Sequence, residues 1–143
     1  MALFSEGSEK ERAAAYRVLI VDDDQQFNAL LAEIFRGVGY QVTTAASAES
    51  GLEVLAREPV DLVITDQRMP GMSGVAFIER IRADFGGKAV IMVSGFLESE
   101  TLDRLKSLEV NAVFSKPMNI PDLLSAAGRA VEPAPGPSAI RAQ

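Results

Sequence analysis

The fold is decided by the stretch Val60-Asp61-Leu62-Val63-Ile64-Thr65-Asp66-Gln67-Arg68-Met69-Pro70-Gly71-Met72-Ser73-Gly74. Its first half, from Leu62 to Thr65, is a run of apolar and β-branched residues, which is typical of a buried strand. The Met-Pro-Gly that follows cannot extend a strand, so Asp66 is predicted to lie where the strand ends and a loop begins. In an open α/β sheet this edge is where ligands bind, although an aspartate there can also simply start a turn or cap the next helix.

Apolar runs elsewhere in the chain predict further strands, and segments with helical spacing separate them. The predicted strands cover residues 18–21, 40–45, 62–65, 89–93 and 112–114. Apolar residues recur at helical spacing over residues 27–38, 48–55, 75–85, 102–108 and 120–131. Ser47 and Ser73 are predicted N-caps of the second and third of these segments. Strands that alternate with helices in this way predict an α/β fold, a doubly wound five-stranded parallel sheet with helices on both faces.

The length and composition are those of one soluble domain. The chain has 143 residues, 48% of them hydrophobic and 24% charged. No apolar run approaches the ~18 residues of a membrane span. Residues 1–16 lack the apolar core of a signal peptide and are predicted to be a leader or linker, residues 17–131 the folded domain, and residues 132–143 a Pro-rich disordered tail. We therefore expect a cytoplasmic protein without membrane association.

The absence of two residue types narrows the possible chemistry. The chain has no Cys, which excludes disulfides, thiolate metal sites and thiol nucleophiles. It has no His, which excludes Ser-His-Asp catalysis and a phosphohistidine formed on this chain. A net charge of −6 argues against binding the phosphate backbone of nucleic acid. Carboxylates, hydroxyls and lysines therefore remain for chemistry.

Polar and charged residues follow four of the predicted strands and are expected to meet at one edge of the sheet. They are Asp22, Asp23, Asp24, Asp66, Ser94 and Lys116. Crowded carboxylates repel one another unless a proton or a cation intervenes, and two or three of them suit Mg²⁺. Lys116 adds a positive charge for a phosphoryl or carboxylate oxygen, and Ser94 adds a hydroxyl donor. Taken singly, Ser94 could be a turn residue and Lys116 a surface lysine, and Asp24 is expected to be an N-cap rather than a ligand.

The chain resembles the receiver domain of two-component response regulators. The resemblance rests on Val18-Leu19-Ile20-Val21-Asp22-Asp23-Asp24, on residues 66–74, on Ser94-Gly95 and on Ser115-Lys116-Pro117, which stand in the family's order. It extends over roughly residues 17–131 and implies a flavodoxin-like (βα)5 fold with strand order 2-1-3-4-5. It also implies a signalling switch that accepts a phosphoryl group from a partner phosphohistidine, as in a phosphorelay.

The resemblance assigns roles to the residues at the strand ends. Asp66 is similar to the family's phosphoacceptor and to one of its Mg²⁺ ligands. Asp23 resembles a direct Mg²⁺ ligand, and Asp22 resembles an acid that holds metal-bound water. Lys116 matches the invariant lysine, whose bond to Pro117 is typically cis in the family.

Two further positions complete the implied site and its output. The backbone carbonyl of Arg68 resembles another Mg²⁺ ligand, and Ser94 occupies the position of the switch hydroxyl. On phosphorylation, Ser94 is expected to bond a phosphoryl oxygen and to bias the surface made by the last two helices and the last strand. The implied partners are a histidine kinase or phosphotransfer protein as donor and a downstream protein, or a larger chain of its own, as target. Phosphorylation could also produce a homodimer.

The chain departs from the family pattern at two places. Val113 stands three residues before the lysine, where the family usually has Tyr or Phe, and Phe114 is predicted to point to the opposite face of the strand. Glu109 and Val110 stand where the family favours Gly-Ala. Output through loop ordering alone is therefore one hypothesis.

Alternatives to the phosphoacceptor switch stay open at this point. A haloacid-dehalogenase-like phosphatase would use Asp22 and Asp24 as nucleophile and acid, but this leaves residues 66–74 unexplained. A receiver that has lost its chemistry and serves only for docking is disfavoured because every acid and the lysine are present. The chain is either a stand-alone regulator or part of a hybrid sensor kinase. A separate hypothesis is that Arg68 and Phe96, which flank the site, screen the acyl phosphate from water.

Overall fold

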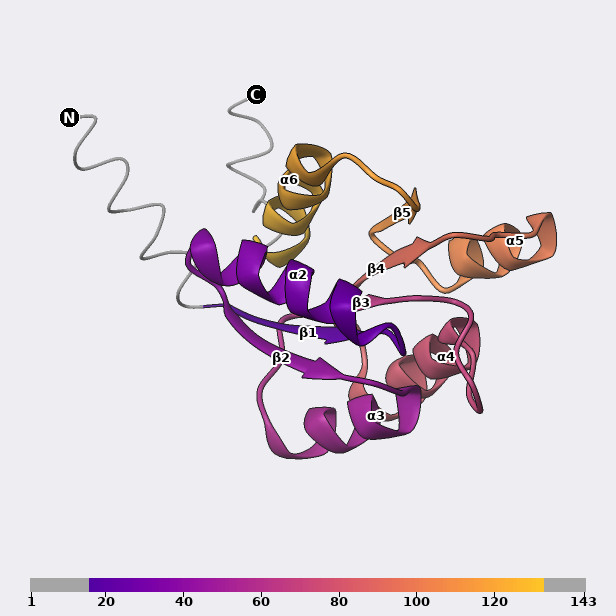
Figure 1. The fold of residues 1–143 in the computed structure, drawn as a ribbon. Helices are drawn as coiled ribbons and strands as arrows, with labels where there is room; N and C mark the ends of the chain where they lie inside the picture. The colour runs from indigo at the N-terminus through magenta and orange to yellow at the C-terminus, as the bar shows by residue number, and fades with distance from the viewer. Residues whose placement is uncertain (1–15, 133–143) are drawn as a thin grey trace, which may run out of the picture.

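The computed structural model describes residues 16–132, in which parallel strands alternate with helices (Figure 1). The strands are β1 (Arg17–Val21), β2 (Gln41–Ala45), β3 (Leu62–Thr65), β4 (Ala89–Ser94) and β5 (Ala112–Ser115). The helices are α2 (Gln25–Gly37), α3 (Ala48–Arg57), α4 (Gly74–Phe85), α5 (Ser99–Ser107) and α6 (Ile120–Val131). The strands form one sheet in the order β2-β1-β3-β4-β5, which confirms the predicted α/β fold. The predicted leader and tail lie outside the described residues, apart from Tyr16 and Glu132.

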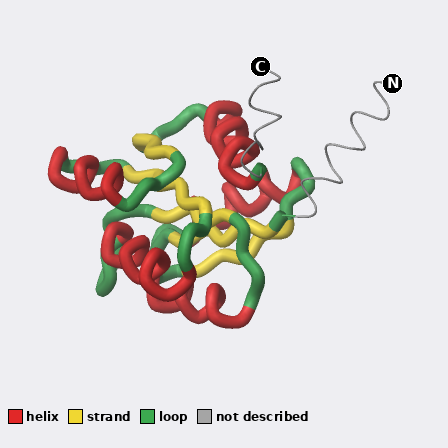
Figure 2. Tube along the Cα trace, turned by 180° about the vertical axis from the view of Figure 1, so that it is seen from behind, coloured by secondary structure: helices red, strands yellow, loops and turns green. Residues whose placement is uncertain are grey.

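Alternate residues of the central strands point to opposite faces of the sheet and build two cores. On one face, Val18 and Ile20 pack with buried side chains of α2 and α6. On the other, Leu19 and Val21 pack with buried side chains of α3, α4 and α5. The sheet therefore lies between two helical layers (Figure 2). Since β1 and β3 are covered on both faces, their side chains are apolar almost throughout, as is usual in parallel sheets.

The register of the strands brings the predicted site residues to one edge. Val21, the last residue of β1, pairs with Thr65, the last residue of β3. The residues that follow them, Asp22 and Asp66, are therefore neighbours where the two strands end. Ser94 at the end of β4 pairs with Ser115 of β5, which places Lys116 at the same edge.

Short polar side chains fix the starts of the helices beside that edge. Ser47 and Ser73 cap α3 and α4, as predicted, and accept the backbone N–H of Ser50 and Ala76 at 3.1 and 3.2 Å. Asp24 caps α2 and accepts the N–H groups of Gln26 and Phe27. Each such cap stabilises a helix by about 1 kcal/mol. The helix starts are therefore held in place by the chain's own side chains.

The helical patterns identified the helices but did not identify all the residues that they bury. Leu30 and Val38 match the helical spacing of α2, yet they are 52% and 39% exposed, while Leu31 and Phe35 are fully buried. Phe77 of α4 is also fully buried, although the helical spacing predicts an inward face made of Val75, Ile78, Ile81 and Phe85. Each helix contacts the sheet along one narrow stripe, and an apolar residue about 100° around the helix from that stripe faces solvent.

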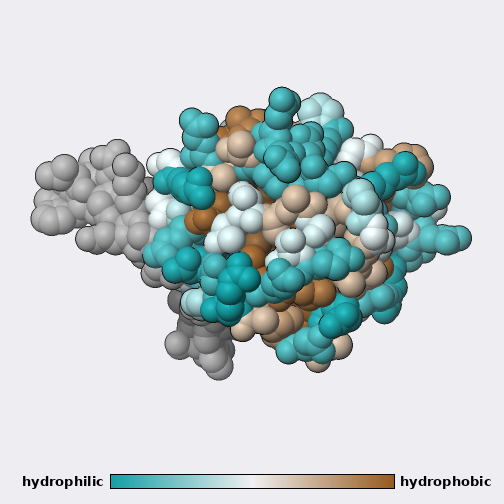
Figure 3. Space-filling model, turned by 60° about the horizontal axis from the view of Figure 1, so that its bottom comes forward, coloured by the Kyte–Doolittle hydropathy of each residue, from teal (hydrophilic) through white to brown (hydrophobic). Residues whose placement is uncertain are grey.

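The outer surface is mainly hydrophilic on the side where α3 lies. Figure 3 shows hydrophilic side chains over most of this side, with hydrophobic atoms in smaller areas between them. None of the helices within residues 16–132 combines the length and the apolar character needed to cross a membrane.

Candidate functional site

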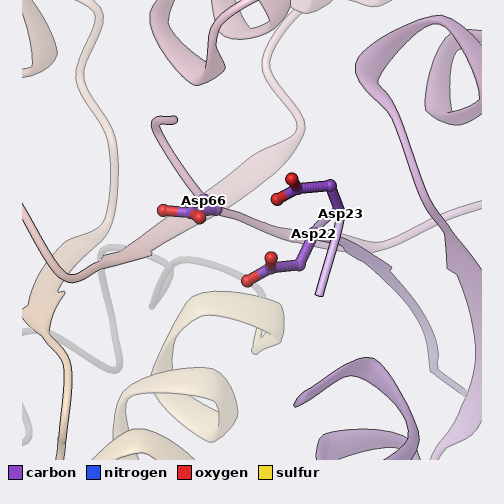
Figure 4. A group of neighbouring side chains, drawn as sticks. All are labelled: Asp22, Asp23 and Asp66. Carbon is purple, nitrogen blue, oxygen red and sulfur yellow. The ribbon is translucent and has the colours of Figure 1, made fainter. Parts of the chain in front are cut away.

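Three carboxylates meet at the carboxyl edge of the sheet. Asp22 and Asp23 follow β1, Asp66 follows β3, and their carboxylate oxygens lie within 4.8 Å of one another. Figure 4 shows the three side chains gathered beside this edge. The backbone N–H of Asp22 donates to the carbonyl of Ala45 at 3.2 Å, and that of Asp66 donates to the carbonyl of Val21 at 3.1 Å. Strand-like hydrogen bonding thus continues through the first acid after each strand and fixes its position.

The loop after β3 holds Asp66 against the start of α4. Asp66 Oδ1 accepts the backbone N–H of Gln67 at 2.7 Å, and Gln67 Oε1 accepts the N–H of Val75 at 2.8 Å. A β-carbon on Gly74 would collide with the backbone carbonyl oxygen of Asp66, so this close approach requires glycine. Gln67 had no predicted role, because its contact is to a backbone group that any sequence supplies.

Lys116 reaches the acids from the end of β5. Its Nζ donates to Asp22 Oδ2 at 2.7 Å and lies 3.6 Å from Asp66 Oδ2. The backbone N–H of Lys116 donates to the carbonyl of Ser94 at 2.9 Å, and the Lys116–Pro117 bond is cis, as the family resemblance implies. The sequence predicts this lysine beside the acids, and the structure places it there.

Burial and the charge of the partner shift the pKa values of Asp22 and Lys116 in opposite directions. Asp22 is 2% exposed. The pKa of its carboxyl is raised, first by burial and further by the negative charge of Asp66, although the hydrogen bonds from Lys116 and from the Asp24 N–H lower it. Burial lowers the pKa of Lys116, but the hydrogen bond and charge of Asp22, together with the charge of Asp66, raise it above its ordinary value. Lys116 is therefore a stable cation at neutral pH.

The donor set of this edge fits a magnesium ion. Three carboxylates face one ammonium group, so a fully ionised cluster has an excess negative charge that a divalent cation balances. All the donors are oxygens, which Mg²⁺ prefers, and Asp23 is exposed, so bound water has access to the ion. The three acids predicted from the sequence therefore fit the expected cation.

Ser94 lies at the end of β4, and its hydroxyl is engaged with its own loop. The residue is 1% exposed, and its Oγ donates to the carbonyl of Phe96 at 3.3 Å and accepts the Phe96 N–H at 3.5 Å. On the neighbouring strand, Val113 packs against the core shared with α4 and α5, whereas Phe114 packs against the core shared with α2 and α6. The prediction that Phe114 points to the opposite face from Val113 is confirmed.

Two side chains stack at the outer rim of the site. Arg68 lies in the loop after β3, two residues beyond Asp66, and its guanidinium carbon is 4.2 Å from the centroid of the Phe96 ring. Phe96 is 49% exposed and Arg68 is also exposed. A residue of the loop after β3 and a residue of the loop after β4 thus form a cation–π pair beside the acids.

The side chains of Asp24 and Phe27 make two further contacts beside the three acids. The carboxylate of Asp24 is used as the cap of α2, which agrees with the prediction of an N-cap and gives no support to a phosphatase that uses Asp22 and Asp24. Phe27, in the first turn of α2, places its ring centroid 4.1 Å from Lys116 Nζ. The sequence pattern does not predict this contact, and its only signal is an aromatic residue five positions after Asp22.

Comparison with known proteins gives one consistent family. The model of the response regulator receiver domain matches residues 18–128. The chain is 32% identical to sporulation initiation phosphotransferase F of Bacillus subtilis over 110 residues, which are 77% of this chain and 89% of that protein.

Solved structures agree with the sequence match. The structure of a CheY-like response regulator receiver domain protein from Methanospirillum hungatei has a TM-score of 0.78 and 31% identity and covers 81% of this chain and 93% of its own. Response regulator protein TrrA from Thermotoga maritima, solved in complex with Mg²⁺ and BeF, has a TM-score of 0.73 and 29% identity and covers 80% of this chain and 98% of its own.

Proposed function

The chain belongs to the response regulator receiver family of two-component systems, and on that premise we propose that it is a Mg²⁺-dependent phosphoacceptor switch with Asp66 as the acceptor. The observation that carries the proposal is the meeting of three carboxylates and one ammonium group where β1, β3 and β5 end. Residues 17–131 are the proposed receiver unit.

The proposed reaction transfers a phosphoryl group to Asp66 from a phosphohistidine. One ionised carboxylate oxygen attacks the phosphorus in line, so that an O–P bond forms while the P–N bond to the donor imidazole breaks. The electron pair of the broken bond stays on the imidazole nitrogen, and the product on Asp66 is an acyl phosphate. The 143 residues contain no His, so the donor is a histidine kinase or a phosphotransfer protein.

The surrounding groups would orient Asp66 and compensate charge. The Gln67 N–H holds one carboxylate oxygen, and Lys116 Nζ lies beside the other, where it meets the negative charge of an incoming phosphoryl group. Asp22, Asp23 and Asp66 would hold Mg²⁺, with the backbone carbonyl of Arg68 as a further ligand. When bound, the cation supplies positive charge to the transferring oxygens.

Ser94 is the proposed reporter of phosphorylation. Its hydroxyl would exchange its contacts with the Phe96 backbone for one with a phosphoryl oxygen on Asp66, and this would draw in the loop between β4 and α5. Val113 supplies no aromatic ring to follow that movement, so we propose that loop ordering conveys the signal to the surface of α5, β5 and α6. A downstream protein, a larger chain or a second copy would read that surface.

Arg68 and Phe96 are proposed to lengthen the life of the acyl phosphate. Their stacked side chains stand between the loop after β3 and the loop after β4, where they would limit the approach of water to Asp66. The proposal predicts that Arg68→Ala and Phe96→Ala hydrolyse the acyl phosphate several-fold faster than the wild-type chain, measured by loss of phosphoprotein with time. Unchanged hydrolysis in both variants would contradict it.

The central proposal is tested by mapping the phosphorylated residue. The chain is incubated with acetyl phosphate and Mg²⁺, and the modified peptide is identified by mass spectrometry. We expect modification at Asp66, its loss in Asp66→Asn, and no change in the control Asp103→Asn, which alters an exposed acid of α5. An acyl phosphate that persists in Asp66→Asn, or that maps to Asp22 or Asp24, would refute the proposal.

A further inference from the structure

The ammonium group of Lys116 is in contact with an aromatic ring as well as with the acids. Nζ lies 2.7 Å from Asp22 Oδ2 and 3.6 Å from Asp66 Oδ2. The ring centroid of Phe27 is 4.1 Å from the same nitrogen, which is within the ~6 Å range of a cation–π interaction. Two carboxylates and a ring thus flank this cation.

The ring has a fixed place because the first turn of α2 is tied to the ends of two strands. The Phe27 N–H donates to Asp24 Oδ1 at 3.1 Å. The next residue, Asn28, donates from Nδ2 to the carbonyls of Asp22 at 2.8 Å and Ala45 at 3.0 Å. Phe27 is also packed against the core shared with α6. The backbone at Phe27 is therefore held at the ends of β1 and β2, and its ring packs against the core.

We propose that Phe27 is a positioning residue, whose ring holds the ammonium group of Lys116 at the phosphorylation site through a cation–π contact. The inference rests on the proposed role of Asp66 as phosphoacceptor. The face of the ring attracts a cation without a directional hydrogen bond. Nζ can therefore turn from Asp22 towards a phosphoryl oxygen on Asp66 while it stays against the ring. An aliphatic side chain would fill the same space but would present no negative face.

The half-buried setting makes the contact large enough to measure. The Lys116 side chain is 23% exposed, so water competes only in part for the ammonium group. Cation–π contacts in such settings correspond to about a 3- to 10-fold change in rate. We expect that decrease in the phosphorylation rate when the ring is replaced by an aliphatic side chain.

The test separates the electrostatics of the ring from its bulk. Phenylalanine analogues with one and with three ring fluorines are placed at position 27 of the full chain, because fluorine weakens the negative face and nearly preserves the shape. The rate of phosphorylation by acetyl phosphate in Mg²⁺ and the thermal stability are measured for each protein. Phe27→Leu, which uses a natural amino acid, removes the ring altogether and leaves an aliphatic side chain. The same replacements at Phe35, a fully buried residue of the same helix, serve as the matched control.

The expected result is a stepwise decrease in rate with fluorination at position 27, a further decrease in Phe27→Leu, and no dependence on fluorination at position 35. Suppose that the wild-type chain is phosphorylated at Asp66 and that Lys116→Ala slows the reaction. Rates that then stay the same across the fluorine series would overturn this inference alone and would show that Phe27 is only a packing residue. Absence of phosphorylation at Asp66 in the wild-type chain would instead overturn the proposed function.

Discussion

Charged residues gather at both edges of the sheet, but those at one edge lack enough partners and those at the other have them. At the carboxyl edge, three carboxylates face a single ammonium group. At the opposite edge, where the strands begin (the amino edge), a cavity of about 450 Å³ is lined by residues that include Asp61, Arg82, Lys88 and Glu109. Its two cations already donate to backbone carbonyls, Lys88 Nζ to that of Val60 at 2.9 Å. A cavity with charged walls is therefore not enough to indicate chemistry. The difference is that the acids of the carboxyl edge outnumber their partners, whereas the cations of the amino edge are already satisfied.

Arg82 of α4 is the centre of the amino edge. Its guanidinium group donates to the carbonyls of Leu108 at 2.9 Å, Lys88 at 2.7 Å, Gly86 at 3.3 Å and Glu109 at 3.3 Å. These contacts join the loop after α4 to the loop between α5 and β5. Glu109 has a φ of 57°, a left-handed conformation that Gly adopts more easily. The departure from the family's Gly-Ala at Glu109 and Val110 thus lies in a loop that Arg82 holds in place.

The largest expected effect comes from removing charge at the carboxyl edge. Asp23→Asn should slow phosphorylation by acetyl phosphate about 100-fold or more, because Mg²⁺ would lose one of its proposed ligands. Without Mg²⁺ the same variant should unfold no more easily than the wild-type chain, since one repulsive charge is gone. In the wild-type chain, Mg²⁺ at 100 times its Kd should add about 2.7 kcal/mol to the free energy of unfolding.

The measurements for Asp23→Asn are the phosphorylation rate and urea unfolding with and without Mg²⁺. Asp103→Asn removes the same charge from an exposed position on α5 and should retain both the rate and the stabilisation by Mg²⁺. A variant at Asp23 that keeps the full Mg²⁺ stabilisation would show that the acid is not a ligand.

An effect of intermediate size is expected at the amino edge, and it concerns the free energy of unfolding instead of the phosphorylation rate. Arg82→Ala leaves the carbonyls of Leu108 and Lys88 without their charged donor, so the free energy of unfolding should fall by about 2–3 kcal/mol. The phosphorylation rate and the Mg²⁺ response of the folded chain should stay within about twofold of wild type, because no side chain belongs to both edges.

Arg80→Ala is the matched control for Arg82. Arg80 lies on the same helix and pairs at 3.2 Å with Asp84, four residues on, where both side chains are about half exposed. Such a pair contributes only about 0.3–0.5 kcal/mol. Equal losses of stability in the two variants would remove the distinction between an arginine that binds four backbone carbonyls and an ordinary surface arginine.

The same contrast explains how far the sequence predicts this molecule. The strands and helices, and the meeting of Asp22, Asp66 and Lys116, follow from patterns along the chain because every parallel strand delivers its end to one edge. The Arg82 contacts do not, since backbone carbonyls are present in every residue and leave no pattern. Nor does the contact of Phe27 with Lys116, which depends on the rotation of α2 about its own axis.

The smallest expected effect concerns the strained residue of the amino edge. Glu109→Gly keeps the Glu109 carbonyl that Arg82 binds and removes the steric cost of a φ of 57°. The free energy of unfolding should rise by about 0.5–1 kcal/mol, because the relief of strain exceeds the added flexibility of the unfolded chain. Glu100→Gly, in the first turn of α5, should instead lower it by about 0.5 kcal/mol. If Glu109→Gly also lowers stability in urea unfolding, then the Glu109 side chain stabilises the loop, and the amino edge is held by more than the contacts of Arg82 with the backbone.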